Sequence, residues 1–399
     1  MRHPWVTQNL KLLDDSPDPA GLLCDLSSPL RTGGNDDQRY PVELFRKLRI
    51  DNNELTEQRA GWKNAAARLL EIKACPAALE DVQGLHVDVF VHESGEFAES
   101  LVPGDDLPAL FADVLSAMPN LSMLYWNIPV KATKNFEKSF VQSKLVLPSV
   151  RHLTLGPYSD FLVVMSPNLD SLNAGTPLSW NRYMPPPGPI HFLLQSAAES
   201  GIQNLSIYNR NSGGSNAWGP ELVQQVMASC PNLTSFTMSG FLQSTGGYHY
   251  GAPQGGTQKG SQLKAILAVL SRFPRLEHLG LPSAEHLDLD FDGGPFCGNA
   301  FEGAQGRAFG RVLLEESLIA MEFAANMTMA ALPQLKSLSI GLQQPNLMKN
   351  ETGETYISWP WTGRIEEYVH EIYPEVEDGD NEQSNNRPVY WTEEDWEDF

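Results

Sequence analysis

The residues with the strongest potential for chemistry form a short acidic run, Asp288-Leu289-Asp290-Phe291-Asp292-Gly293. Three carboxylates at alternate positions, followed by glycine, imitate the first half of a calcium-binding loop. The twelfth position of such a loop requires a bidentate glutamate, but it is Asn299 in this chain. Because Leu287, Leu289 and Phe291 alternate with the carboxylates, the run is predicted to be a half-buried strand with a solvated acidic face, and no metal site is predicted.

Other local patterns of catalysis or cofactor binding are missing from the sequence. The glycine-rich segment 246–261 contains no phosphate-binding loop, because Lys259 is followed by Gly260. Neither G-x-S-x-G nor H-E-x-x-H occurs, and no two histidines pair at the spacing of metal ligands. We therefore predict a protein without catalytic residues or cofactors. The alternative is an enzyme whose site lies in the loops 243–310, which a cluster of carboxylate and histidine side chains with perturbed pKa values would support.

The cysteines and the charge exclude further classes of function. The four cysteines are scattered without a C-x-x-C pair, which predicts that they stay reduced in the core. A formal net charge of −21 argues against a nucleic-acid partner, because phosphate backbones are bound by clustered Lys and Arg. The sequence contains no apolar run of about 18 residues and no secretory signal at MRHPWVTQNLKLLDD. We predict no membrane partner and a cytoplasmic or nuclear location.

One phrase recurs along the chain, a proline followed by apolar residues spaced L-x-x-L-x-L, as in LPSVRHLTL from Leu147. Proline ends a helix, and alternating apolar residues are typical of a strand with one buried face. The middle apolar position of each predicted strand falls at Leu85, Leu124, Leu153, Leu172, Leu205, Phe236, Leu279 and Leu338. The gaps between these positions range from 19 to 59 residues, which predicts inserted loops of unequal length.

Helical patterns, with apolar residues near i, i+3, i+4 and i+7, precede most of these strands. They cover residues 62–74, 107–118, 188–200, 219–229, 261–273 and 311–332. This alternation predicts an α/β fold, specifically an irregular leucine-rich-repeat-like solenoid with a parallel sheet on the concave face and helices outside. Its expected parts are an atypical N-terminal cap (1–60), the solenoid (61–345), a C-terminal cap (346–373) and an acidic disordered tail (374–399).

Candidate binding residues lie on or just beyond the predicted strands, at positions expected to face the concave side. Rows of aromatic, amide and hydroxyl side chains across neighbouring strands make an adaptable protein-binding surface. The candidates are Tyr125, Asn127, Thr154, Tyr208, Asn209, Thr237 and Ser339.

The P-x-L-x-x-L-x-L strands, with their preceding helices and irregular loops, resemble the leucine-rich-repeat portion of fungal F-box-type proteins over roughly residues 60–345. In that family an N-terminal F-box recruits the Skp adaptor of a cullin–RING ubiquitin ligase, and the repeats hold the substrate. The nearest match to the opening of an F-box is Tyr40-Pro41-Val42-Glu43-Leu44. The residues after it, FRKLRIDNNELTEQRAGW, are too few and too polar for a three-helix F-box.

Taken together, the sequence predicts a non-enzymatic scaffold that binds protein partners. The resemblance adds a more specific expectation, a substrate-recognition subunit of a ubiquitin ligase with Skp and cullin as partners.

Overall fold

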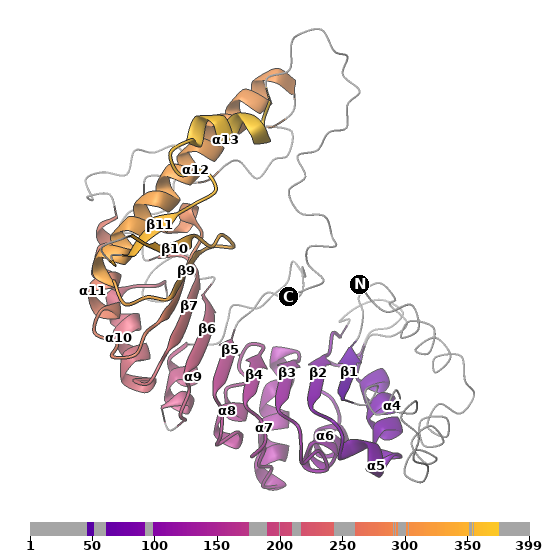
Figure 1. The fold of residues 1–399 in the computed structure, drawn as a ribbon. Coiled ribbons are helices and arrows are strands. Elements are labelled where there is room, and N and C mark those ends of the chain that lie inside the picture. The colour runs from indigo at the N-terminus through magenta and orange to yellow at the C-terminus, as the bar shows by residue number, and fades with distance from the viewer. Residues whose placement is uncertain are drawn as a thin grey trace, which may run out of the picture. The chain divides into compact units, whose positions relative to one another are not determined.

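The fold is taken from a computed structural model (Figure 1). It describes residues 46–51, 61–91, 99–174, 190–209 without 199, 217–242, 260–289, 291, 293, 301, 303–350, 353 and 355–374. The chain divides into two compact units. The first unit comprises Met1–Tyr208 and Gln225–Leu233, and the second comprises Asn209–Gln224 and Thr234–Phe399.

Strands and helices alternate through the first part of the chain. The strands are β1 (Lys47–Asp51), β2 (Gly84–Asp88), β3 (Met123–Asn127), β4 (His152–Leu155), β5 (Ser171–Ala174) and β6 (Asn204–Asn209). The helices are α4 (Trp62–Lys73), α5 (Pro76–Leu79), α6 (Asp106–Ser116), η4 (Val130–Ala132), α7 (Thr133–Gln142), α8 (Phe161–Met165), α9 (Ile190–Ala197) and α10 (Pro220–Ser229). Figure 1 shows helices α4 to α9 along one side of strands β1 to β6.

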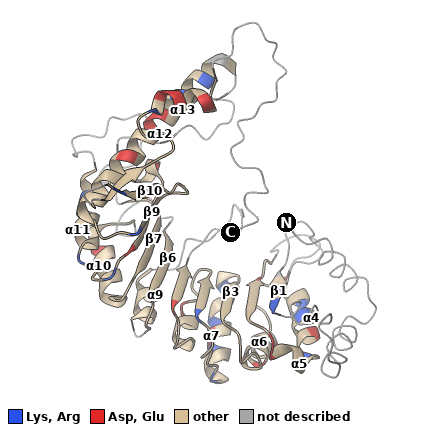
Figure 2. Cartoon of the chain, viewed as in Figure 1, with Lys and Arg blue, Asp and Glu red and all other residues tan. Residues whose placement is uncertain are grey.

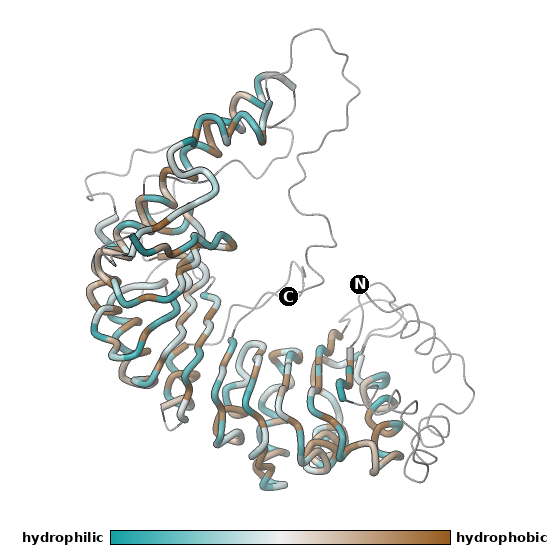
Figure 3. Tube along the Cα trace, in the orientation of Figure 1, coloured by the Kyte–Doolittle hydropathy of each residue, from teal (hydrophilic) through white to brown (hydrophobic). Residues whose placement is uncertain are grey.

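The register of these strands explains their burial. The central leucines pair across neighbouring parallel strands, from Leu85 to Leu124 and on through Leu153, Leu172 and Leu205. All five are at most 2% exposed. Because side chains alternate between the two faces of a strand, this row and the row two residues further pack against the helices. Figure 3 shows the resulting alternation of apolar and polar residues along the strands.

An aromatic cluster fills the space between β3 and the helices α6 and α7. The ring of Trp126 lies edge-on to Phe111, Phe136 and Phe140, with centroid distances of 5.3, 5.4 and 5.7 Å. All four side chains are completely buried. Edge-to-face packing of aromatic rings adds stability beyond the area that they remove from water, so this cluster fixes how the two helices lie on the sheet.

The turns before the strands are held by asparagine side chains. Asn120 donates from Nδ2 to the carbonyl oxygen of Glu80 at 2.7 Å, and Asn168 donates in the same way to that of Pro148 at 2.9 Å. Each bond links the turn before one strand to the turn before its neighbour, so the proline-containing phrase also supplies a lateral connection.

The second unit contains three strands of the same kind, β7 (Ser235–Gly240), β8 (His278–Leu281) and β9 (Ser337–Ile340). It also holds α11 (Ser261–Leu270), η6 (Ala284–His286), α12 (Gly303–Ala331), the antiparallel hairpin β10 (Asn346–Lys349) and β11 (Thr355–Ser358), and α13 (Ile365–Ile372). The predicted central positions again pair in register, Phe236 with Leu279 and Leu279 with Leu338.

The structure corrects the predicted leucine-rich-repeat-like solenoid. The chain has an α/β fold in which strands β1 to β6 of the first unit, and strands β7 to β9 of the second, follow one another in sequence order as parallel neighbours. The connections hold helices that range from 4 residues in α5 to 29 in α12, so no unit of constant length recurs. The recurring phrase marks where strands begin, and it does not define a repeated module.

Several boundaries also differ from those predicted. Residues 47–51, assigned from the sequence to an N-terminal cap, form β1 and pair with β2. The predicted strand over the acidic run is wrong, because η6 is followed by a bend through Leu289. The acidic tail lies outside the described residues from position 375 on, as do Tyr40 to Leu44.

Candidate functional site

The strongest candidate site is the face of strands β1 to β6 that is turned away from the helices, here called the open face. It carries one residue from each strand, paired in register from neighbour to neighbour: Arg49, His86, Tyr125, Thr154, Asn173 and Ser206. These positions are half-exposed or exposed, whereas the residues before and after them in each strand are buried. The open face is therefore a polar row laid over a completely apolar layer.

Two aromatic rings form the centre of this row. The imidazole of His86 stacks on the phenol ring of Tyr125 with centroids 4.1 Å apart and an interplanar angle of 7°. The two residues are directly opposite each other in β2 and β3. Stacking across adjacent parallel strands holds both rings in one orientation, which lowers the entropic cost of binding a partner against them.

A second row lies one step further along the strands. Asn127 donates from Nδ2 to Oδ1 of Asp88 at 2.9 Å, which orients its amide. Its Oδ1 reaches over Gly156, where a Cβ would lie only 2.3 Å away. Gly156 thus leaves room for the side chain of Asn127. Tyr208 of β6 is half-exposed in the same unit.

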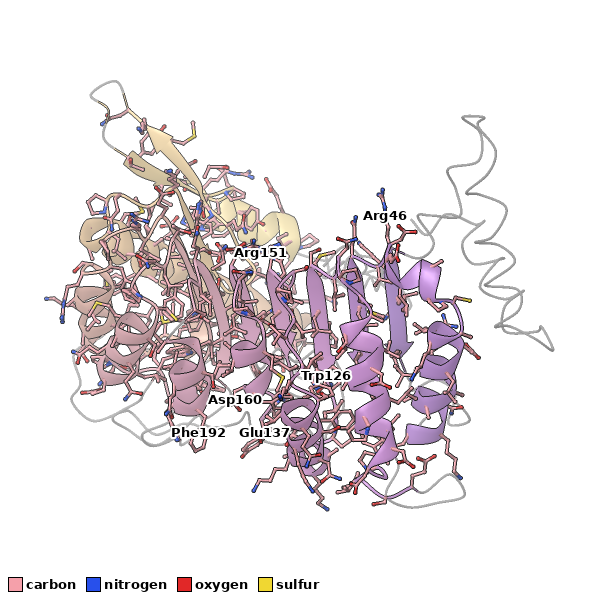
Figure 4. The ribbon with its side chains drawn as sticks, turned by 90° about the horizontal axis from the view of Figure 1, so that it is seen from below. Arg46, Trp126, Glu137, Arg151, Asp160 and Phe192 are labelled. Carbon is pink, nitrogen blue, oxygen red and sulfur yellow. The ribbon has the colours of Figure 1, made fainter. Side chains whose placement is uncertain are left out.

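The edge of the open face nearest the strand starts carries arginines. Figure 4 shows Arg46 and Arg151, which precede β1 and β4, at the same end of the strands, while Glu137 and Phe192 lie with the helices. Arg151 donates from Nη1 to the carbonyl oxygen of Asn168 at 2.9 Å and lies 3.7 Å from Oδ2 of Asp170. These exposed groups extend the polar surface beyond the strand row.

The second unit has its own short polar row, Thr237, Gly280 and Ser339, paired in register across β7, β8 and β9. A Cβ on Gly280 would lie 2.7 Å from Cγ2 of Thr237 and 3.1 Å from Oγ of Ser339. The side chains of Thr237 and Ser339 therefore approach each other over Gly280, which has no side chain of its own. Next to this row, Nδ1 of His278 lies 2.7 Å from Oγ of Ser337.

The structure places most of the predicted binding residues on these faces. Tyr125 and Thr154 lie together in the first unit, and Thr237 and Ser339 flank Gly280 in the second. The prediction that Asn209 faces the binding surface is wrong, because this residue is completely buried at the end of β6. In that six-residue strand the burial alternates to its end, and the alternation turns Asn209 inward.

Besides Arg49, three members of the open face were missed from the sequence: His86, Asn173 and Ser206. Each directly follows the central leucine of its strand, as Tyr125 and Thr154 do. Applying that one offset to every predicted strand finds all three. Arg49 was missed because the proline of the phrase is replaced by Glu43, although the apolar spacing is present as Phe45, Leu48 and Ile50.

The described part of the loops 243–310 brings three polar side chains together at η6. Ser283 donates from Oγ to Oε1 of Glu285 at 2.7 Å and lies 3.1 Å from Nδ1 of His286. Burial lowers the pKa of His286, against the opposing effect of the Glu285 carboxylate. The ring of Phe241 covers the imidazole at a centroid distance of 4.0 Å.

Among the described residues, no group of three or more His, Cys, Asp or Glu side chains is placed to hold a metal ion. Asp290 and Asp292 of the acidic run lie outside the description. Cys230 is free and buried, and burial raises the pKa of its thiol to about 11. Cys75 is disulfide-bonded, so the prediction that all four cysteines stay reduced is wrong for this residue. No helix in the described ranges has the length and apolar character needed to cross a bilayer.

Comparison with known proteins identifies no family. No family model matches the chain, and no curated protein matches its sequence. A GH1 β-glucosidase from the fungus Humicola insolens, solved with glucose, shares 10% identity over 77% of this chain and 88% of its own, with a TM-score of 0.24. A β-glucosidase from Trichoderma harzianum shares 9% identity over 78% and 87%, with a TM-score of 0.22. Both TM-scores are too low to carry an argument about fold or activity.

Proposed function

We propose that this chain is a non-enzymatic scaffold that binds a protein partner on the open face of its first unit. The observation that carries the proposal is the row of six register-paired side chains, with the stacked rings of His86 and Tyr125 at its centre. Tyrosine and arginine are enriched at protein interfaces, because they combine a large contact area with directional hydrogen bonds.

The chemistry of the row fits a protein ligand better than a small molecule. Its members are spread one per strand, so the six of them extend over about 24 Å at the usual strand spacing of about 4.8 Å. A small-molecule site is a concave pocket that surrounds its ligand, whereas an extended polar row matches the dimensions of a polypeptide segment. Recognition would proceed by shape and hydrogen-bond complementarity across the sheet.

The rival proposal is an enzyme with its site in the loops 243–310, and Ser283, Glu285 and His286 are its strongest support. Their geometry favours a structural role. The Ser283 hydroxyl lies closer to Oε1 of Glu285, at 2.7 Å, than to Nδ1 of His286, at 3.1 Å, and all three residues belong to one tight turn. A nucleophilic serine donates to its base, so this arrangement does not prepare Ser283 for attack. We therefore favour the scaffold.

Photo-crosslinking tests the proposal. A photoreactive phenylalanine analogue placed at Tyr125 or at Thr154 is expected to capture the same partner from the native source, identified by mass spectrometry. The matched control is the same analogue at Val164, a 69% exposed residue of α8 on the helical side. We expect His86→Ala to reduce capture at position 154 about tenfold or more, as for the loss of an aromatic interface anchor.

Two outcomes would decide against the proposal: equal capture at Val164, or no effect of His86→Ala in a variant with an unchanged melting curve. The identity of the partner also tests the ligase hypothesis. Skp and cullin among the partners would support a substrate-recognition subunit of a ubiquitin ligase, and a different stable partner in their place would limit the proposal to protein binding. The strand at Lys47–Asp51 occupies part of the segment in which an F-box would need helices.

A further inference from the structure

The long helix α12 carries an apolar stripe on its outer surface, formed by Phe309, Val312, Ile319 and Phe323. These side chains are 40, 51, 46 and 38% exposed. Their spacing of three, seven and four residues places them within one quadrant of the helix circumference. Solvent-facing helix surfaces are ordinarily polar, so a stripe of four large apolar residues on one helix points to an interaction surface.

The opposite side of α12 is already occupied. Leu318, Met321, Ala324 and Ala325 are buried in the second unit. Towards its N-terminal end, α12 packs against α13, where a Cβ on Gly310 would lie 3.1 Å from the ring of Tyr373. The stripe therefore lies on a different side of the helix from these buried residues. At its ends Phe309 contacts the ring of Phe301, with centroids 5.8 Å apart, and Cε1 of Phe323 would lie 3.3 Å from a Cβ on Gly260, whereas Val312 and Ile319 between them are about half-exposed.

The charges around the stripe are acidic. Glu315 and Glu316 are exposed, and Glu316 lies within the stripe between Val312 and Ile319. The exposed Glu366 and Glu367 belong to α13, on the packed side of α12, and Figure 2 shows acidic residues on both helices. The two arginines of α12, Arg307 and Arg311, are half-exposed, and Nη1 of Arg311 donates to the carbonyl oxygen of Tyr373 at 3.3 Å.

We propose that the apolar stripe of α12 binds a basic amphipathic helix of a partner protein. Apolar residues of such a helix would cover the stripe, and its Lys or Arg residues would lie opposite Glu315 and Glu316. From Phe309 to Phe323 the stripe extends about 21 Å, which a partner helix of about 15 residues matches. Helix-on-helix docking through anchors at i, i+3 and i+7 is a common mode of peptide recognition.

A second copy of this chain fits the stripe less well. Glu316 stands midway between Phe309 and Phe323, so two copies that overlap along the whole stripe bring their Glu316 side chains together in either orientation. Like charges in direct opposition are destabilising at a helix interface. A partner with a cation at the central position removes this repulsion, which is why we commit to a basic helix.

The test uses a fluorescein-labelled peptide of about 18 residues, built from Leu and Lys with the leucines on one helical face, and the full-length protein. Binding is followed by fluorescence anisotropy. A scrambled peptide of equal composition reports attraction to the net negative charge alone. We expect the amphipathic peptide to bind at least about tenfold more tightly than the scrambled one, because only it can cover the stripe.

Variants locate the binding. The double variant Val312→Ser/Ile319→Ser is expected to weaken binding about tenfold or more by removing apolar contact area. Glu315→Gln/Glu316→Gln is expected to weaken it severalfold at low salt and to reduce its salt dependence. The matched control Leu342→Ser alters a 67% exposed residue of the same unit outside α12, and its affinity is expected to equal that of the wild type.

Three results would overturn the proposal: equal affinity for the scrambled peptide, unchanged affinity of the Val312→Ser/Ile319→Ser variant, or a dimer that light scattering detects and that the same variant dissolves. The last result would assign the stripe to self-association. Because these residues are exposed, the variants should fold normally, and matching thermal melts by circular dichroism check this point. If the α12 proposal fails, the open-face proposal is unaffected, since crosslinking at Tyr125 does not involve α12.

Discussion

At the scale of single residues, Cys230 gives the molecule a defined sensitivity to high pH. Its side chain is 1% exposed, and burial raises the pKa of its thiol from 9.0 to about 11. The folded protein therefore keeps the thiol proton at pH values where the unfolded chain loses it. Stability from this residue is fully present below pH 9 and is lost as the pH rises from 9 towards 11.

We expect the free energy of unfolding to fall by about 2 kcal/mol between pH 8 and pH 10.5 through Cys230 alone, at about 1.4 kcal/mol per pKa unit. Urea unfolding at pH 8 and pH 10.5 measures it. Cys230→Ala serves as the control, because the remaining tyrosine and lysine titrations are common to both proteins. Parallel pH dependence of the two proteins would contradict the expectation.

At the scale of secondary-structure elements, the aromatic cluster makes β3, α6 and α7 one packing unit. Phe136 of α7 is completely buried and lies within 5.4 Å, centroid to centroid, of both Phe111 and Trp126. Phe136→Ala is expected to lower the free energy of unfolding by about 3–5 kcal/mol, because it removes aromatic area and leaves a cavity. Chemical denaturation followed by circular dichroism measures the loss.

Val141→Ala is the matched control on the same helix. Val141 is 61% exposed, so its truncation should change stability by less than about 0.5 kcal/mol. Similar losses for Phe136→Ala and Val141→Ala would mean that helix propensity, and not the cluster, governs the stability of α7.

Sequence patterns located the elements with unequal success. The helices predicted at 62–74, 107–118 and 261–273 correspond to α4, α6 and α11, and every predicted central strand position lies in a strand. Strand β1 was missed, because its sequence KLRID lacks the proline phrase and its pairing with β2 fixes it as a strand. The apolar spacing of the phrase is nevertheless present at Phe45, Leu48 and Ile50, so a search that required the proline is what missed this strand.

The sequence could predict which residues of the candidate site share a face, but it could not predict the contacts between their side chains. The offset from the central leucine identifies which side chains share a face, since the strands are in register. The stacking of His86 on Tyr125 and the space that Gly156 leaves for Asn127 depend on the lateral distance between strands, which sequence spacing does not encode. The stripe on α12 was hidden for another reason: its residues fit a helical period equally well whether they face the core or the solvent.

At the scale of the whole molecule, charge limits the choice of partner. With 49 acidic against 28 basic residues, the chain repels polyanions at neutral pH. We expect no binding to duplex DNA at about 0.15 M salt, because too few clustered cations are available to release counterions from the phosphates. An electrophoretic mobility assay over a salt series tests this, and a submicromolar affinity with a steep salt dependence would refute it.

The shared register of strands β1 to β6 also gives the side chains of the open face a regular spacing. Its side chains recur at the strand spacing of about 4.8 Å. An α-helix laid across the strands repeats every 5.4 Å or so, and over five steps it drifts out of phase by only about 3 Å. The two-residue period of an extended segment is about 6.7 Å, which exceeds the strand spacing by about 2 Å at every step. A helical ligand laid across the open face would therefore stay closer in register with its side chains than an extended ligand would.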